Sequence, residues 1–289
     1  MNYNELWRKL AQVYDEGEAK AIARMVYEVR YGLTFADLCL GKDRQLSADC
    51  QTELEEIAVR LMNQEPVQYV LEVADFCGRQ FHVASGVLVP RPETEELCRW
   101  IIQNEPSTLS IQNASLCHIL DVGTGSGCIA VTLAAELPEA RVTAWDISPE
   151  ALAIAQENAR RHGVSVKFEQ VDMLKCSLAS LHAPLPSQYD LIVSNPPYIC
   201  NKERGQMAVN VLEYEPHTAL FVPDDDPLLF YRAIADYATK ALRPSGWLYF
   251  EINPLYAAPL QELLRSMSFS SIEIKTDAYG KQRMLRAQR

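Results

Sequence analysis

The stretch ILDVGTGSG, residues 119–127, decides the fold of this chain. It begins with apolar residues, carries a carboxylate at Asp121 and ends in three alternate glycines, and a largely apolar run from 128 to 137 follows it. This order is typical of a strand, a tight turn and a helix. Glycines let the backbone adopt positive φ and approach a ligand closely, and the helix presents its positive N-terminal end there. The stretch therefore predicts a nucleotide-type binding loop in an α/β domain.

Around this loop the sequence alternates between expected strands and expected helices. Strands are expected near residues 118, 142, 166 and 190 and over 247–252, 271–275 and 282–286, and the clearest helices over 93–104 and 228–242. Such alternation is typical of a doubly wound, mostly parallel sheet. The predicted fold class is thus α/β, with a seven-stranded Rossmann-like domain over residues 92–289.

The N-terminal part of the chain has a different pattern. Between residues 3 and 64, apolar residues recur three or four positions apart, as in helices that share a core. Those expected in the core are Leu6, Leu10, Val13, Tyr14, Ala21, Ile22, Met25, Val26, Leu54, Ile57, Leu61 and Met62. Phe76, Phe81 and Val83, with glycines at 78 and 86, indicate a β-hairpin linker over 71–91. We expect a helical bundle over residues 1–70 that docks a protein partner.

Two further carboxylates follow expected strands and favour an adenosyl cofactor. Asp146 ends an apolar run 25 positions past Asp121, where a carboxylate can grip a ribose diol. Asp172 ends the next such segment and can accept a hydrogen bond from an adenine amino group. This arrangement fits either NAD or S-adenosylmethionine. The G-x-G-x-G spacing and Cys128 lean away from a pyrophosphate loop without excluding one.

The tetrapeptide Asn195-Pro196-Pro197-Tyr198 ends a further apolar run and indicates an amino-methyltransferase. The amide oxygen of Asn195 and the backbone carbonyl of Pro196 can each accept one N–H of a poorly nucleophilic nitrogen. The prolines fix φ and remove backbone donors that would compete for these acceptors. Tyr198 is expected to offer a flat apolar face, with its hydroxyl reaching solvent or a backbone group.

Ligands of such sheets bind at the carboxyl ends of the strands, so these segments are expected around one crevice. The predicted cofactor-binding residues are Asp121, Gly123, Thr124, Gly125, Ser126, Gly127, Asp146, Ile147, Asp172, Met173 and Asn195. The predicted catalytic residues are Asn195, Pro196, Pro197 and Tyr198.

The chain resembles, nearly from end to end, the peptide chain release factor glutamine methyltransferases of the PrmC/HemK type. Besides the glycine loop and the tetrapeptide at 195–198, the resemblance rests on EPVQY at 65–69, VLVPRPETE at 87–95, and Glu215-Pro216 followed by Ala219-Leu220. It implies a class I S-adenosylmethionine methyltransferase that methylates the side-chain N5 of the glutamine in a release factor's Gly-Gly-Gln motif. S-adenosylhomocysteine would be the product and the release factor the protein partner.

The chain departs from the family pattern at three places. Residues 222–227 lack a glycine, residues 253–256 replace a Gly and a Gln, and Met173 stands where an aromatic residue is common. The roles of Arg91 and Glu93 stay open.

Three alternatives remain. An adenine-N6 or other amino-methyltransferase acting on nucleic acid shares the 195–198 tetrapeptide, but a net charge of −11 argues against stable binding to phosphates. An NAD(P)-dependent oxidoreductase leaves that tetrapeptide without a purpose. A non-catalytic binding module does not explain the intact glycines and both cofactor carboxylates.

Composition argues against several other classes. The eight cysteines and five histidines, which include Cys176 and His182, share no spacing that indicates a metal site or a disulfide framework. No apolar run approaches the ~18 residues of a membrane span. The N-terminus lacks the layout of a secretion signal, so the expected location is cytoplasmic.

Overall fold

The computed structural model describes residues 1–109, 117–175 and 189–289; Cys176 and His182 lie outside these ranges. The chain forms two compact units. One contains Met1–Val73, Val83–Ser85 and Met207–Tyr214, and the other contains Ala74–His82, Gly86–Gln206 and Glu215–Arg289. Within the described ranges, no helix combines the length and the apolar character that a membrane crossing requires.

The first unit is helical, as predicted. Its helices are α1 (Tyr3–Leu10), α2 (Glu16–Tyr31), α3 (Phe35–Cys39), α4 (Ala48–Met62), α5 (Val67–Leu71) and α9 (Val209–Tyr214), with the 3-10 turn η1 (Lys42–Gln45). Asn2 begins α1 with a capping box to Glu5, and Gly32 ends α2 in the left-handed conformation that glycine adopts without strain. The helix α9 comes from far along the chain, and the Tyr214 hydroxyl donates to the Asn63 carbonyl at 2.8 Å. The sequence pattern did not predict this addition.

The predicted core of this unit is confirmed for most positions and wrong for two. Leu6, Leu10, Ile22, Val26, Leu54, Ile57 and Leu61 are buried. Val13 is exposed because α1 ends at Leu10, so Val13 lies beyond the helix whose apolar spacing it continues in the sequence. Ala21 is exposed because the buried face of α2 runs through Ala19, Ile22, Ala23 and Val26. Ala21 lies outside that face of the helix.

The predicted β-hairpin is present as β1 (Val73–Phe76) and β2 (Arg79–His82). The buried rings of Phe76 and Phe81 meet edge to face with centroids 5.8 Å apart, and both belong to a core cluster of the second unit. Asn158 of α8 (Pro149–Arg161) donates to the carbonyls of His82 and Ser126 at 2.9 and 2.8 Å. This one buried amide thus joins the hairpin to the glycine loop.

The second unit contains a seven-stranded sheet in the order β10-β11-β9-β6-β3-β4-β5. Its strands are β3 (Cys117–Val122), β4 (Ala140–Asp146), β5 (Val166–Gln170), β6 (Tyr189–Ser194), β9 (Leu242–Glu251), β10 (Ser270–Thr276) and β11 (Gln282–Gln288). Strands β9, β6, β3, β4 and β5 are parallel to one another. Strand β11 runs antiparallel to both β9 and β10. Strand order reverses between β3 and β6, which is where ligands bind in sheets of this kind.

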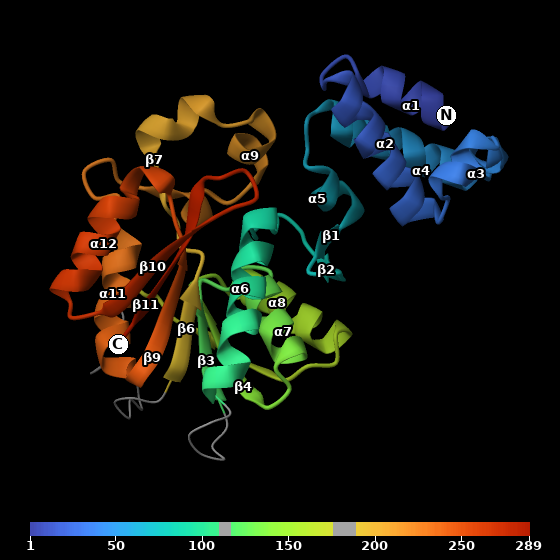
Figure 1. The fold of residues 1–289 in the computed structure, drawn as a ribbon. Helices are drawn as coiled ribbons and strands as arrows, with labels where there is room; N and C mark the ends of the chain where they lie inside the picture. The colour runs from blue at the N-terminus through green and yellow to red at the C-terminus, as the bar shows by residue number, and fades with distance from the viewer. Residues whose placement is uncertain (110–116, 176–188) are drawn as a thin grey trace. The chain divides into compact units, whose positions relative to one another are not determined.

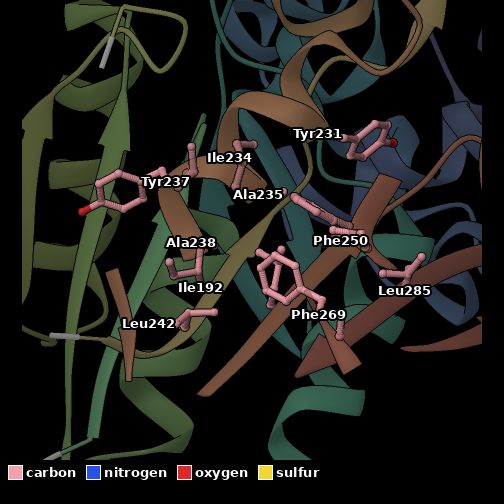
Figure 2. Packing of buried hydrophobic residues seen from close by; sticks show 14 of the residues in the cluster. Ile192, Tyr231, Ile234, Ala235, Tyr237, Ala238, Leu242, Phe250, Phe269 and Leu285 are labelled. Atoms are coloured by element: carbon pink, nitrogen blue, oxygen red, sulfur yellow. The ribbon is translucent and has the colours of Figure 1, made fainter. Parts of the chain in front are cut away.

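Helices cover both faces of this sheet (Figure 1). One face packs against α11 (Leu229–Ala241) and α12 (Ala257–Ser266), and the other against α6 (Pro92–Leu109) and α7 (Cys128–Glu136). Neighbouring strand residues therefore enter different clusters, as Leu191 and Ile192 do. Figure 2 shows side chains of one cluster, in which Tyr231, Ile234 and Ala238 pack with Ile192, Phe250 and Leu285.

The register of the parallel strands places the ends of the site-forming segments at one edge. Val122 of β3 is aligned with Trp145 of β4 and with Ser194 of β6, and Ser194 is aligned with Phe250 of β9. The residue after each of these is Gly123, Asp146, Asn195 and Glu251, respectively. All four consequently lie at the carboxyl edge of the sheet.

Two features beyond this edge were not predicted. The strand β7 (Ile199–Cys200) directly follows the tetrapeptide and pairs in parallel with β8 (Phe221–Val222). Three short helical segments also belong to the described part of this unit: η2 (Asn201–Gln206), α10 (His217–Leu220) and η3 (Pro254–Tyr256). The chain after Tyr198 is therefore held by a second small sheet.

Candidate active site

The glycine loop forms an open cradle at the end of β3. Gly123 and Gly125 have φ of 75° and 56°, and a Cβ built on either would meet nothing within 4 Å. Both line a cavity of about 430 Å³. The backbone N–H groups of Gly123 and Thr124 donate to the Trp145 carbonyl at 2.8 and 2.9 Å, which fixes the turn. Because glycine has no side chain, a ligand has room to lie against the backbone at these two positions.

Gly127 has a packing role and does not line the cavity. Its φ is 81°, and a Cβ there would lie 2.9 Å from the Cβ of Ala155 on α8. The third glycine of the loop thus permits close approach of α7 and α8.

Asp121 lies beneath the loop and is fully buried, outside the cavity lining. Its Oδ2 accepts a hydrogen bond from the Thr124 hydroxyl at 2.6 Å. Burial raises the pKa of Asp121 to about 7, although the hydrogen bond from Thr124 lowers it. Asp121 therefore stabilises the loop through Thr124 and does not line the cavity.

Asp146 and Asp172 both line the cavity, as do Ile147 and Met173. The Asp146 carboxylate accepts from the Gly125 N–H at 2.8 Å and from the Ser148 N–H at 2.9 Å. A hydrogen-bonded ion pair with Lys175 holds the pKa of Asp172 below its ordinary value. The Ile147 side chain is 55% exposed, so an apolar surface lies beside the two carboxylates.

The tetrapeptide 195–198 lies across the same cavity, which Asn195, Pro196 and Pro197 line. The Asn195 Nδ2 group donates to the Thr94 Oγ1 atom at 3.2 Å. Thr94 belongs to the first turn of α6 and in turn donates to Glu251 Oε2 at 2.5 Å. Glu251, the last residue of β9, is only 1% exposed, and this burial raises its pKa.

The expectation for the Tyr198 hydroxyl is wrong. It reaches neither solvent nor a backbone group, because it donates to Glu251 Oε1 at 2.9 Å. The Tyr198 side chain packs against a core cluster and is not among the residues that line the cavity. Burial raises the pKa of this phenol well above its ordinary value. The reason is tertiary: β9 ends beside β6, and its terminal carboxylate attracts the hydroxyl.

The segment 86–91 forms a wall of the cavity that residue-by-residue reasoning did not assign. Gly86, Val87, Leu88, Pro90 and Arg91 line it, as do Thr94 and, farther along the chain, Pro216, Thr218, Ala219 and Phe221. Glu215 is buried and joins the segment 86–91 to the lining residues that follow it in the chain. Its Oε1 accepts from Arg91 Nη2 at 2.5 Å, and its Oε2 accepts from the Val89 N–H at 3.1 Å. Arg91 therefore acts as a clamp in this structure.

The departures from the family pattern lie around the site and leave it intact. Pro223 and Met173 line the cavity. Asn253 lies behind the tetrapeptide, where its Nδ2 group donates to the Tyr198 carbonyl at 3.1 Å. Within the described ranges, no three His, Cys, Asp or Glu side chains are arranged to hold a metal ion.

Comparison with known proteins connects this geometry to a family. Residues 113–251 match a model described as a methyltransferase domain, and residues 4–71 match one described as the PrmC N-terminal domain. A release factor glutamine methyltransferase of Bacteroides thetaiotaomicron is 44% identical over 98% of this chain and 97% of its own length. A second, from Flavobacterium psychrophilum, is 43% identical over 96% of this chain and 94% of its own length.

A solved structure supports the fold alone. The human methyltransferase 10 domain containing protein aligns with a TM-score of 0.53 and 19% identity, over 84% of this chain and 98% of that one. The predicted class I methyltransferase fold is thereby confirmed. The oxidoreductase and the non-catalytic module are set aside, and the methyl donor is S-adenosylmethionine, as predicted. The chain belongs to the release factor glutamine methyltransferase family.

Proposed function

We propose that this chain methylates the side-chain amide nitrogen of the glutamine in the Gly-Gly-Gln motif of a peptide chain release factor. One observation carries the proposal: the acceptor loop 195–197 and the glycine cradle line the same cavity. A substrate amide held by the loop would thus face a donor held by the cradle. The family supports the substrate, because its relatives bear the corresponding name.

The residues predicted for the cofactor suit an adenosyl group. Asp146 has acceptor capacity left on its carboxylate for a ribose diol, and Asp172 can accept from an adenine amino group. Ile147 and Met173 supply apolar surface for the purine ring. Gly123 and Gly125 leave the backbone open to the amino-acid part of the donor. S-adenosylmethionine supplies an electrophilic methyl group on a sulfonium centre.

The acceptor loop would then overcome the weakness of an amide as a nucleophile. The Asn195 Oδ1 atom and the Pro196 carbonyl each accept one N–H, which holds the hydrogens while the nitrogen lone pair turns out of conjugation. These hydrogen bonds strengthen as the nitrogen gains positive charge, so they stabilise the transition state more than the ground state. The acidic N–H of the product loses its proton to water, and the carbonyl conjugation returns.

The release factor is also the proposed binding partner of the helical unit. That unit contributes none of the residues that line the cavity, although it carries exposed apolar side chains such as Leu40, which is 76% exposed. Such side chains suit contact with a protein surface. Because release factors act on ribosomes, the proposal places the reaction in the cytoplasm.

A labelling experiment tests the substrate. The full-length chain is incubated with methyl-tritiated donor and, in separate reactions, with intact release factor, duplex DNA and ribosomal RNA. A release factor whose Gly-Gly-Gln glutamine is replaced by asparagine is the matched control. Label on the intact release factor that disappears in the control supports the proposal. Label on DNA alone would favour the adenine-N6 alternative, and equal label on the control would move the acceptor to another residue.

A further inference from the structure

Glu251 is a buried acid that the proposed chemistry does not use. It lies at the carboxyl edge of the sheet, beside the acceptor loop, with a side chain almost removed from water. A buried carboxylate is costly unless it is hydrogen-bonded or paired. Here each oxygen has a hydroxyl donor, from Thr94 at 2.5 Å and from Tyr198 at 2.9 Å. Both donors belong to segments that line or flank the cavity.

The chemistry of these groups sets the direction of each hydrogen bond. The Thr94 and Tyr198 hydroxyls each donate to one oxygen of Glu251, so the single hydroxyl hydrogen of Thr94 points to Glu251. The Thr94 Oγ1 atom can then offer only lone pairs to Asn195, 3.2 Å away. Asn195 must meet those lone pairs with its Nδ2 group, which leaves Oδ1 for another partner. Glu251, acting through Thr94, thereby determines that the Oδ1 end of the Asn195 amide is free for another partner.

We propose that Glu251 and Thr94 are positioning residues that fix the orientation of the Asn195 amide, so that it presents an acceptor to the substrate nitrogen. The inference rests on the proposed function and deepens it. An Asn195 rotated by half a turn would direct its own N–H groups at the N–H groups of the substrate. Two donors cannot hydrogen-bond, so the acceptor loop would lose one of its two acceptors.

The rest of the environment holds the acid and the loop in place. The Tyr231 hydroxyl donates to the backbone carbonyl of Glu251 at 3.0 Å, and Asn253 donates to the carbonyl of Tyr198 at 3.1 Å. The loop is therefore anchored at Asn195 through Thr94 and at Tyr198 through Glu251 directly. Prearranged acceptors of this kind need no reorganisation during the reaction.

A pair of variants at residue 94 tests the inference. Thr94→Val keeps the shape but removes the hydroxyl, and Thr94→Ser keeps the hydroxyl. With saturating donor and intact release factor, we expect Thr94→Val to lower kcat about tenfold, as for the loss of one hydrogen bond, and Thr94→Ser to stay within about twofold of the parent chain. Donor affinity, measured by isothermal titration, and release factor KM should change by less than about twofold. A Val variant with parent kcat would overturn the inference, as would a Ser variant as slow as the Val variant.

A double-mutant cycle separates positioning from other effects. If Thr94 acts through Asn195, adding Thr94→Val to Asn195→Ala should lower kcat by less than about twofold further. A full tenfold additional loss would show that Thr94 acts elsewhere and would overturn the inference. Glu251→Gln adds an independent check, because it replaces one of the two accepting oxygens with an NH2 group that only donates. It should resemble Thr94→Val and likewise add nothing to Asn195→Ala; if it does not fold, the residue 94 pair decides.

These outcomes are distinct from failure of the proposed function. If the parent chain labels the Gly-Gly-Gln glutamine while the Thr94 variants behave as the parent does, only the positioning inference fails. If the parent chain does not label that glutamine, the proposed function itself is wrong.

Discussion

At the scale of single residues, Asn195 connects the chemistry to the scaffold. Its Nδ2 group is engaged by Thr94, and its side chain lies at the cavity wall. An amide nitrogen has a lone pair delocalised into its carbonyl, so catalysis requires control of its two hydrogens. In the proposed reaction, Asn195 and Pro196 supply two oxygen acceptors from adjacent residues of the chain. Few other pairs of adjacent residues could do this without adding a competing donor.

We expect Asn195→Ala to lower turnover by roughly 10² or more, because one hydrogen bond that strengthens in the transition state is lost. Donor affinity and the midpoint of thermal unfolding should change little, since Asn195 is partly exposed at the cavity. Single-turnover rates with saturating donor measure the effect. A variant with turnover near that of the parent chain would refute the role of Asn195.

The raised pKa of Asp121 predicts that the free energy of unfolding depends on pH. Its pKa is about 7 in the folded chain, above its ordinary value of 3.8, because it is fully buried. The folded state therefore binds a proton that the unfolded state has lost, and the free energy of unfolding falls as pH rises from about 4 to 7. The contribution of this one group amounts to roughly 4 kcal/mol.

Urea unfolding of the parent chain and of Asp121→Asn at pH 4, 5, 6 and 7 measures this effect. In Asp121→Asn, the free energy of unfolding should lack the pH dependence that the Asp121 carboxyl causes. The plots of free energy against pH for the two chains should therefore converge or cross as pH rises. Parallel curves over the whole range would contradict the assignment of a raised pKa to Asp121.

At the scale of elements, the loop from 123 to 127 combines two functions in alternate glycines. Gly123 and Gly125 keep the cavity open, whereas Gly127 lets α7 approach α8. Asn158 of α8 adds a hydrogen bond to the Ser126 carbonyl, so the loop is fixed from the side of the helices as well. A ligand-binding loop is thus held by the same packing that stabilises the domain.

We expect Gly127→Ala to destabilise the fold by about 2–5 kcal/mol, from left-handed backbone strain and from the clash with Ala155. Gly163→Ala is a matched control, because Gly163 also has positive φ, at 66°, and its Cβ would meet nothing within 4 Å. That variant should lose only the strain part, about 1–2 kcal/mol. Equal losses in urea unfolding would mean that the approach of Ala155 carries no cost.

At the scale of the whole molecule, the proposed chemistry and the proposed docking belong to different units. All residues that line the cavity belong to the α/β unit. The helical unit has a core of its own and also includes α9, which comes from beyond the acceptor loop and has no buried residue. One segment of chain thereby leaves the α/β unit after Gln206 and returns to it at Glu215.

A surface substitution on the helical unit tests its docking role. Leu40 is highly exposed, so Leu40→Glu should leave the free energy of unfolding within about 0.5 kcal/mol of the parent. We expect kcat/KM for intact release factor to fall about tenfold, as for an interface residue of moderate importance. Turnover of a short Gly-Gly-Gln peptide should not change. An equal loss with the peptide would argue against docking through this surface.

Much of this molecule follows from local sequence. The period of apolar residues predicted the strands and helices, because a strand buried on both faces and an amphipathic helix each leave a short-range pattern. The glycine loop and the tetrapeptide at 195–198 were found for the same reason, since turn geometry depends on adjacent residues. Val13 and Ala21 show the limit of this reasoning, because a repeat continues in sequence past the point where the helix or its buried face ends.

Sequence alone therefore determined the α/β fold, the glycine cradle, and the residues that line the cavity from the ends of β3, β4 and β6. Only tertiary structure decided the polar connections behind them. Thr94 meets Asn195 across 101 positions and Glu251 across 157, and the Tyr198 hydroxyl turns inward to the same acid. Such contacts depend on the order in which strands lie side by side. A hydrogen bond between residues so far apart leaves no periodic trace in the chain.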